Sequence, residues 1–224
     1  MSKPIVFMKS DRLVNAEHVT RDETRVSILP ATEDALKKVN NNNDAYMPWT
    51  LLPTNRYEGL NVYFDLEAYA FFQRTKELIQ EEADPKGVLR FRRTVKQHDQ
   101  RDIFTGDLYV LLSLFGALKR IDVKQTHSSS RVPYTIVIAS WKNGTMAHLE
   151  YTVADDERIE LEWSSTERII EFDSEHLRPV EGFDLVPSPL VHEIKTILST
   201  AHKADAALLT RLTELNELIH GGDQ

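Results

Sequence analysis

A series of short strand-like segments in the second half of the chain limits the folds that it can adopt. These segments are 118–126, 134–141, 145–153, 158–165 and 167–174. Asn143-Gly144 suits a two-residue hairpin turn between the second and third segments, and polar turn sequences separate the third, fourth and fifth. Successive hairpins at this spacing predict a large, mainly antiparallel sheet.

Helical segments flank this predicted sheet. Apolar residues recur at helical spacing over 65–82, where Asp65 is a plausible N-cap, and residues 106–118 are apolar nearly all round. Two amphipathic helices are expected over 187–222, with a break near His202–Asp205. Segment 87–95 is expected as a further, half-buried strand with a basic wet face. We therefore predict the α+β class: an open, mainly antiparallel sheet with helices on one face.

The first 50 residues have weaker patterns. Short strands are expected over 3–8 and 25–29, a short helix over 32–39, and an exposed loop over the polar stretch 40–48. These elements do not complete an alternation of strands and long helices. We predict that residues 1–50 form a short arm or the remnant of a nucleotide-binding domain, and that residues 51–224 form the α+β domain.

Composition excludes several function classes. The chain has 27 basic and 35 acidic residues, and the net charge of −8 argues against a nucleic-acid partner. The absence of cysteine excludes disulfides, thiolate nucleophiles and Cys-based zinc sites. The longest apolar segment, 108–118, is far shorter than a membrane span, and Lys9 interrupts the N-terminal apolar run. We expect a cytoplasmic protein without a membrane partner.

The order of these elements resembles the C-terminal domain of the glucose–fructose oxidoreductase, inositol dehydrogenase and MocA (Gfo/Idh/MocA) family. The resemblance covers roughly residues 50–220. Its motifs are "PTNRY" at 53–57, "DPKGVLRFRR", "GDLYVLLSLFGALKRIDVKQT", "YTIVIASWKNGTMAHLEYT", "IELEWSSTERIIEFD" and "LVHEIKTIL". The resemblance implies the fold of a sugar or inositol dehydrogenase domain, and an NAD(P)-dependent oxidoreductase as the ancestral activity.

The chain departs from this family where the chemistry is done. The family places a dinucleotide on a glycine-rich turn, whereas the first glycine here is Gly59 and no G-x-G-x-x-G occurs. The family's Glu-Lys-Pro segment has no counterpart, and the buried helix carries Asp107 without a histidine. We interpret the chain as a non-catalytic relative that binds no cofactor and acts by self-association or by binding a sugar-like ligand or a protein. The alternative is an NAD- or NADP-dependent oxidoreductase whose cofactor domain is reduced or supplied in trans.

A few residues are candidates for a site. Asp107 is the weak catalytic candidate, and under a third reading, a hydrolase or isomerase, it works with the neighbouring basic cluster. Arg56, matched to the family's Arg-bearing segment, and Arg90 and Arg92 in the basic cluster are weak ligand-binding candidates for an anionic sugar. Salt-bridged, solvated arginines are the competing interpretation. The histidines show no metal-ligand spacing, so no metal is expected.

The predicted sheet also suggests a partner. Segment 134–141 has Tyr134, Ile136 and Ile138 on one side and Val137 and Trp141 on the other, so both of its faces are largely apolar. Helices are expected over one face, and the other then needs a cover. We expect a homodimer through the open sheet face.

Overall fold

The computed structural model describes residues 3–9, 26–32, 34, 44–52, 59–96, 100–126, 134–175 and 190–220. They fall into two compact units. The parallel-sheet unit comprises Met1–Gln73 and Val191–Glu217, and the mixed-sheet unit comprises Arg74–Leu190 and Leu218–Gln224. No helix in these ranges is long and apolar enough to cross a membrane.

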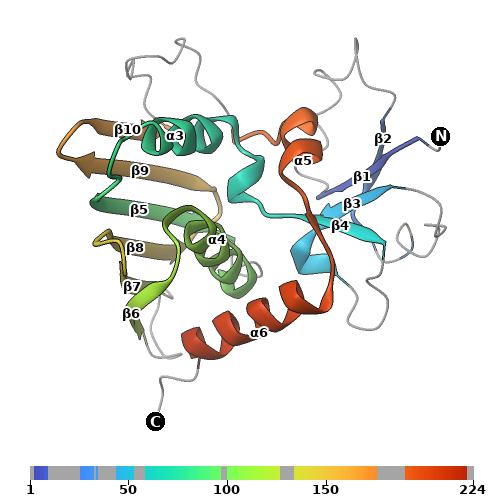
Figure 1. Cartoon of the computed structure of the whole chain (residues 1–224). Helices are drawn as coiled ribbons and strands as arrows, with labels where there is room; N and C mark the ends of the chain where they lie inside the picture. The colour runs from blue at the N-terminus through green and yellow to red at the C-terminus, as the bar shows by residue number, and fades with distance from the viewer. Residues whose placement is uncertain are drawn as a thin grey trace. The chain divides into compact units, whose positions relative to one another are not determined.

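The parallel-sheet unit has a five-stranded sheet in the order β11-β4-β3-β1-β2. Figure 1 labels β1, β2, β3 and β4 of this sheet. Its strands are β1 (Ile5–Met8), β2 (Ser27–Pro30), β3 (Ala45–Pro48), β4 (Leu60–Tyr63) and β11 (His202–Lys203). β1 pairs in parallel with β2 and with β3, and β3 pairs in parallel with β4. Only the two-residue β11 runs antiparallel, against β4. This is an α/β arrangement.

The parallel sheet corrects two predictions. Residues 40–48 were expected as an exposed loop, but Ala45–Pro48 form β3, with Ala45 and Met47 buried. The predicted α+β class, with one mainly antiparallel sheet, omitted the parallel sheet to which the first 50 residues contribute β1, β2 and β3. Each of these strands is four residues long, too short to give an alternating pattern in sequence.

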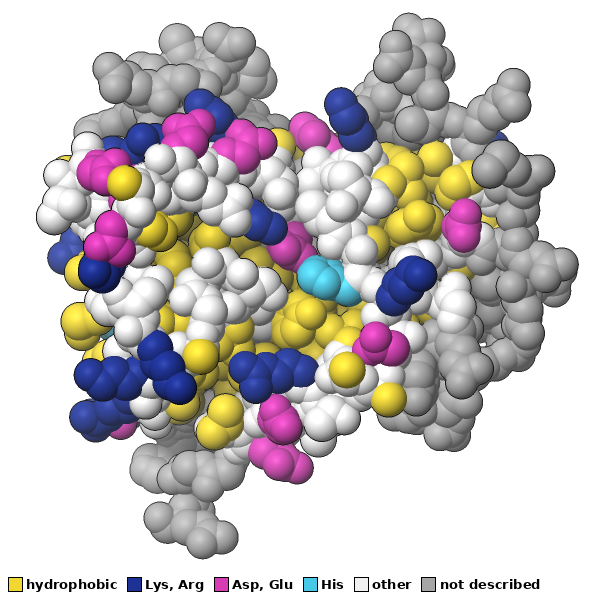
Figure 2. Space-filling model, viewed as in Figure 1, with side chains coloured by type: hydrophobic (Ala, Val, Ile, Leu, Met, Phe, Trp, Pro, Cys, Tyr) yellow, Lys and Arg dark blue, Asp and Glu magenta, His cyan; other side chains and the backbone are white. Residues whose placement is uncertain are grey.

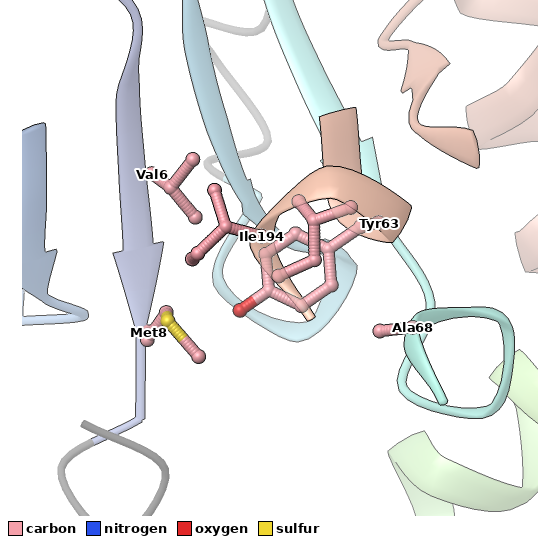
Figure 3. Close-up of a cluster of buried hydrophobic side chains, with 6 residues drawn as sticks. Val6, Met8, Tyr63, Ala68 and Ile194 are labelled. Atoms are coloured by element: carbon pink, nitrogen blue, oxygen red, sulfur yellow. The ribbon is translucent and has the colours of Figure 1, made fainter. Parts of the chain in front are cut away.

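A compact apolar cluster holds α5 (Ile194–Thr200) against one face of the parallel sheet (Figure 3). Ile194 and Ile197 of this helix are at most 3% exposed. They share the cluster with Val6, Met8, Tyr63 and Ala68. The Tyr63 hydroxyl donates to the carbonyl oxygen of Phe7 at 2.8 Å, so the buried phenol is satisfied by β1 itself.

The mixed-sheet unit contains the sheet that the hairpin pattern predicts. Its strands are β5 (Gly87–Val95), β6 (Leu118–Gln125), β7 (Tyr134–Trp141), β8 (Met146–Val153), β9 (Arg158–Ser165) and β10 (Ile169–Asp173). The order is β10-β9-β5-β8-β7-β6, and every pair is antiparallel except β5 with β8. Gly144 has φ +98° in the β7–β8 turn, which confirms the hairpin expected at Asn143-Gly144.

The helices are shorter than the sequence suggests or are shifted. The segment expected as one helix over 65–82 divides into η2 (Leu66–Ala68) and α3 (Ala70–Gln80). The apolar helix is α4 (Gln100–Phe115). The C-terminal pair is α5 and α6 (Ala206–His220), with the expected break between them, and a short η1 (Trp49–Leu51) follows β3. Of the helix expected over 32–39, the structure describes only Thr32 and Asp34.

One face of the six-stranded sheet is buried, and α3 and α4 lie on the same side of it (Figure 1). Phe115 of α4 stacks on Trp163 with ring centroids 5.4 Å apart and meets Trp141 edge-on at 5.2 Å. Phe104 of α4 contacts Tyr151, at 4.8 Å. These aromatic contacts from three strands explain why α4 is apolar nearly all round.

Candidate functional site

The order of the parallel strands defines where a ligand is most readily bound. The chain runs from β1 to its neighbour β2 on one side and then crosses to β3 on the other side of β1. In open α/β sheets, such a reversal leaves a crevice outside the carboxyl ends of the strands, where ligands bind. The relevant edge is therefore the one at which β1, β3 and β4 end.

Two histidine–carboxylate pairs lie where β4 ends. His192 Nε2 is 3.1 Å from Asp65 Oδ1, and His202 Nε2 is 2.7 Å from Glu67 Oε2. Both carboxylates follow β4 directly, one on each side of Leu66 in the chain, whereas both histidines flank α5. The two pairs therefore join the ends of one short helix to the end of one strand. We call these four residues the edge cluster.

Aromatic rings surround the edge cluster. The centroid of the His192 ring lies 4.8 Å from that of Tyr69 and 5.9 Å from that of Tyr63, which it meets edge-on. Neither of its buried ring nitrogens makes a hydrogen bond to a residue that the structure describes, so its 3.1 Å approach to Asp65 is a close contact without hydrogen-bond geometry. The Phe64 ring centroid lies 5.3 Å from that of His202 and 6.1 Å from that of Trp49, the residue that follows β3.

The two pairs differ in burial, and this difference decides which histidine can exchange a proton with a ligand or with solvent. The His192 side chain is 2% exposed and its partner Asp65 17% exposed. In the other pair the histidine, His202, is 27% exposed and the carboxylate, Glu67, only 3%. A histidine that solvent reaches and that a buried carboxylate orients is the usual arrangement of a general acid or base. Within the described ranges, no group of three or more His, Asp or Glu side chains is arranged to hold a metal ion.

Sequence reasoning missed the edge cluster. It placed His192 and His202 in helices, whereas His192 lies in an isolated bridge to Tyr69 before α5 and His202 lies in β11. It treated Asp65 as a helix cap, but Asp65 makes no side-chain cap hydrogen bond at η2 and instead faces His192. Residues 67 and 202 are 135 positions apart, so no local spacing could have brought them together.

Asp107, the catalytic candidate from sequence, lies in the mixed-sheet unit in a buried ion network. Arg93 Nη1 donates to its two carboxylate oxygens at 2.9 and 3.0 Å, and the side chains are 0% and 1% exposed. Arg93 also donates to Glu157 at 2.6 Å, and the Tyr151 hydroxyl donates to Asp107 at 3.3 Å. Burial, followed by the Asp107 charge, raises the pKa of Tyr151 well above its ordinary value. This arrangement fixes α4 to β5 and β8.

Arg90 and Arg92, the ligand-binding candidates, lie on the opposite, open face of the six-stranded sheet. Arg90 pairs with Glu162 at 2.6 Å, and Arg92 pairs with Glu150 at 3.2 Å and Glu160 at 3.4 Å. Arg56 lies outside the described residues. Acidic and basic side chains are likewise interspersed on the surface seen in Figure 2. Of the predicted site residues that the structure describes, Asp107, Arg90 and Arg92, none lies in the edge cluster.

A nicotinamide dinucleotide, which this strand order and the Gfo/Idh/MocA resemblance imply, fits the edge in only one respect. The crevice at the reversal is where dinucleotides bind in such sheets. However, a glycine turn after the first strand is missing. Such a turn lets the pyrophosphate approach bare backbone, but here Lys9 follows β1. The described glycines with positive φ are Gly59, Gly116 and Gly144, which all lie beyond β3 in the chain. The residues after β1 do not fit the usual pyrophosphate contact.

Solved structures confirm the fold. The chain is similar to a probable dehydrogenase from Thermotoga maritima, with a TM-score of 0.54 and 12% identity over 97% of this chain and 86% of that one. It is also similar to scyllo-inositol dehydrogenase from Lactobacillus casei, solved with NAD(H) and scyllo-inositol, with a TM-score of 0.53 and 9% identity over 97% and 89%. A dehydrogenase from Chromobacterium violaceum matches with a TM-score of 0.50 and 8% identity over 77% and 73%.

The likeness extends over nearly the whole chain and includes the parallel sheet. The expectation that it covers the C-terminal domain alone is therefore wrong. The chain therefore has a Gfo/Idh/MocA-like dehydrogenase fold, which it shares with the scyllo-inositol dehydrogenase structure. No family model and no curated protein matches it.

Proposed function

We propose that this protein is an oxidoreductase of the inositol dehydrogenase fold that acts on a sugar-like or cyclic polyol alcohol held at the carboxyl edge of the parallel sheet. The observation that carries the proposal is this sheet, built largely from the first 63 residues, with its strand-order reversal between β1 and β3. The non-catalytic interpretation rested on the missing glycine turn, the missing Glu-Lys-Pro segment and the absence of a histidine on the buried helix, and these departures remain.

The chain's own residues supply binding and acid–base groups at this edge. Within the edge cluster, the partly exposed His202 imidazole and Asp65 carboxylate are the groups that hydrogen-bond ligand hydroxyls, because Glu67 and His192 are at most 3% exposed. The partly exposed Trp49 supplies apolar surface at this edge, whereas Phe64 and Tyr69 are at most 1% exposed and pack behind it. A nicotinamide, if bound, would supply hydride-accepting chemistry. Since the glycine turn is missing, side chains would have to hold its pyrophosphate.

Titration with NADH and NADPH, followed by nicotinamide fluorescence, tests the proposal. It is run with and without 10 mM scyllo-inositol (a concentration chosen for weak binding, on the order of ten times a millimolar Kd). Saturable binding of either nucleotide, together with polyol-dependent reduction of NAD or NADP, supports an oxidoreductase. No saturable signal at millimolar nucleotide refutes it.

A second candidate is a binding module without catalysis, with the same ligand class. It is favoured by the missing glycine turn and by Asp107, whose carboxylate is held by Arg93. Isothermal titration with scyllo-inositol distinguishes the two candidates. Polyol binding without nucleotide binding favours the module, whereas binding of both favours the oxidoreductase.

We also propose that the open face of the six-stranded sheet pairs with a second copy of the chain. Exposed apolar side chains lie on this face, namely Val88 (39%), Ile138 (49%) and Met146 (50%). Between them run the ion pairs of Arg90 and Arg92, which leave little uncompensated charge to be desolvated in an interface.

Light scattering on the size-exclusion eluate tests this pairing. We expect a dimer at micromolar concentration, and Ile138→Glu should shift it to a monomer because the new carboxylate would be buried without a partner. Leu218→Glu is the matched control, since Leu218 is equally exposed (50%) but lies on α6. A monomeric wild-type protein, or the same shift in both variants, contradicts the proposal.

A further inference from the structure

We propose that His202, oriented by Glu67, is the proton-transfer group of the edge site. This inference rests on the proposed function and assigns a residue to one part of it. The fold's buried helix does not serve this purpose here, since α4 has no histidine and its Asp107 is held by Arg93. The parallel-sheet unit, in contrast, carries a paired imidazole at the edge where a ligand would lie.

The geometry distinguishes this pair from the other histidines. The 2.7 Å contact joins His202 Nε2 to Glu67 Oε2, and the Glu67 side chain is only 3% exposed. A buried carboxylate beside one ring nitrogen fixes the orientation and the tautomer of the ring. His202 is paired with Val62 in the β11–β4 register, one residue before β4 ends, and its ring contacts Phe64. The imidazole therefore lies at the carboxyl end of β4, with 27% of its side chain exposed.

His192 has a different role in this account. Its side chain is 2% exposed and lies between the rings of Tyr63 and Tyr69, so a ligand does not reach it without rearrangement. Its Nε2 lies 3.1 Å from the carboxylate of Asp65, the residue at which η2 begins, and Glu67 lies on η2. His192 and Asp65 are thus positioning residues, whereas His202 touches the ligand.

The proton step balances with these groups alone. In the proposed step, His202 is in the tautomer whose Nε2–H donates to Glu67, and Nδ1 is the nitrogen that takes the ligand's proton. The ligand's O–H bond breaks, its proton passes to Nδ1, and the ligand oxygen keeps the electron pair as an alkoxide. The imidazolium so formed is stabilised by the Glu67 carboxylate. A cyclic polyol or another neutral alcohol is the ligand class that offers such a proton.

Carbethoxylation of histidines by diethyl pyrocarbonate, read residue by residue by mass spectrometry, tests the assignment without turnover. The probe is scyllo-inositol. We expect it to slow modification of His202 at least tenfold. The modification rate of His148 should not change, because His148 is exposed (42%) and lies near Glu150 in the mixed-sheet unit, away from the edge cluster. Glu67→Gln should change the modification rate of His202 in the absence of ligand, since it removes the orienting charge.

Variants complete the test. His202→Gln should retain scyllo-inositol binding within about threefold, because the amide still hydrogen-bonds a hydroxyl, and should lower kcat by about 10²–10⁴-fold with little change in KM. His148→Gln should behave as the wild type. If scyllo-inositol or nucleotide binds but His202 is neither protected nor required, the assignment fails and the proposed function stands. If neither probe binds, both fail.

Discussion

Neutralising Asp107 should destabilise the fold rather than remove a catalytic group. In Asp107→Asn the side chain keeps its volume but loses the charge opposite Arg93, whose side chain is fully buried. Breaking a buried ion pair typically costs about 3–5 kcal/mol. Glu157 still contacts Arg93 at 2.6 Å, so the expected loss is at the low end, about 3 kcal/mol of unfolding free energy.

Urea denaturation followed by tryptophan fluorescence measures this loss. The matched control is Asp84→Asn, which breaks the exposed Lys86–Asp84 pair and should cost less than about 1 kcal/mol. The double variant Arg93→Met/Asp107→Leu, which replaces the pair with apolar groups, should be more stable than Asp107→Asn. A loss below about 1 kcal/mol in Asp107→Asn would refute a structural role for the pair.

Three further outcomes follow from the same unit. Burial and the Asp107 charge raise the pKa of the Tyr151 hydroxyl, so the unfolded chain loses the phenolic proton at a lower pH than the folded protein does. The free energy of unfolding should therefore fall as the pH rises above about 10, and Tyr151→Phe should reduce that fall in alkaline denaturation curves. Gly87→Ala should cost about 1–3 kcal/mol by urea denaturation, because its Cβ would lie 2.5 Å from the Ser164 carbonyl oxygen and 2.8 Å from the Trp163 ring. Arg90→Ala should change stability by less than about 1 kcal/mol in the same assay, since its pair with Glu162 is exposed.

The sequence predicted the mixed sheet well because its strands are long. β7, β8 and β9 have eight residues each, enough for alternation to be visible, and Gly144 marks the turn between two of them. β3 and β4 have four residues each and follow polar or unassigned stretches, so no period distinguishes them from a loop. Their strand character comes from pairing with each other and with β1, which is not visible in a local window.

Arginine placement shows a similar limit. Segment 87–95 was expected to have one basic wet face that included Arg90, Arg92 and Arg93. In β5, Arg90 and Arg92 lie on the open face, but Arg93 shares the buried face with Phe91 and is 1% exposed. The period of two in a strand already places Arg93 on the other face. An acidic residue on an apolar helix, Asp107, was the signal that a buried cation needed a partner.

The edge cluster had no signal in the sequence. Asp65 was consistent with a helix cap, and His192 and His202 were consistent with surface positions in amphipathic helices. The contacts between them require β11 to pair with β4 and α5 to pack on the sheet, which are tertiary events. The missing glycine turn was, in contrast, visible from sequence, and it still separates this chain from the usual dinucleotide site.

The most direct test of a ligand site at the carboxyl edge is to map binding by backbone amide chemical shifts on titration with scyllo-inositol. The account predicts that shifts gather at the end of β4 and in η2, residues 63–69, and around His202 in β11. Shifts confined to the open face around Arg90 and Arg92, or no shifts at all, would contradict it.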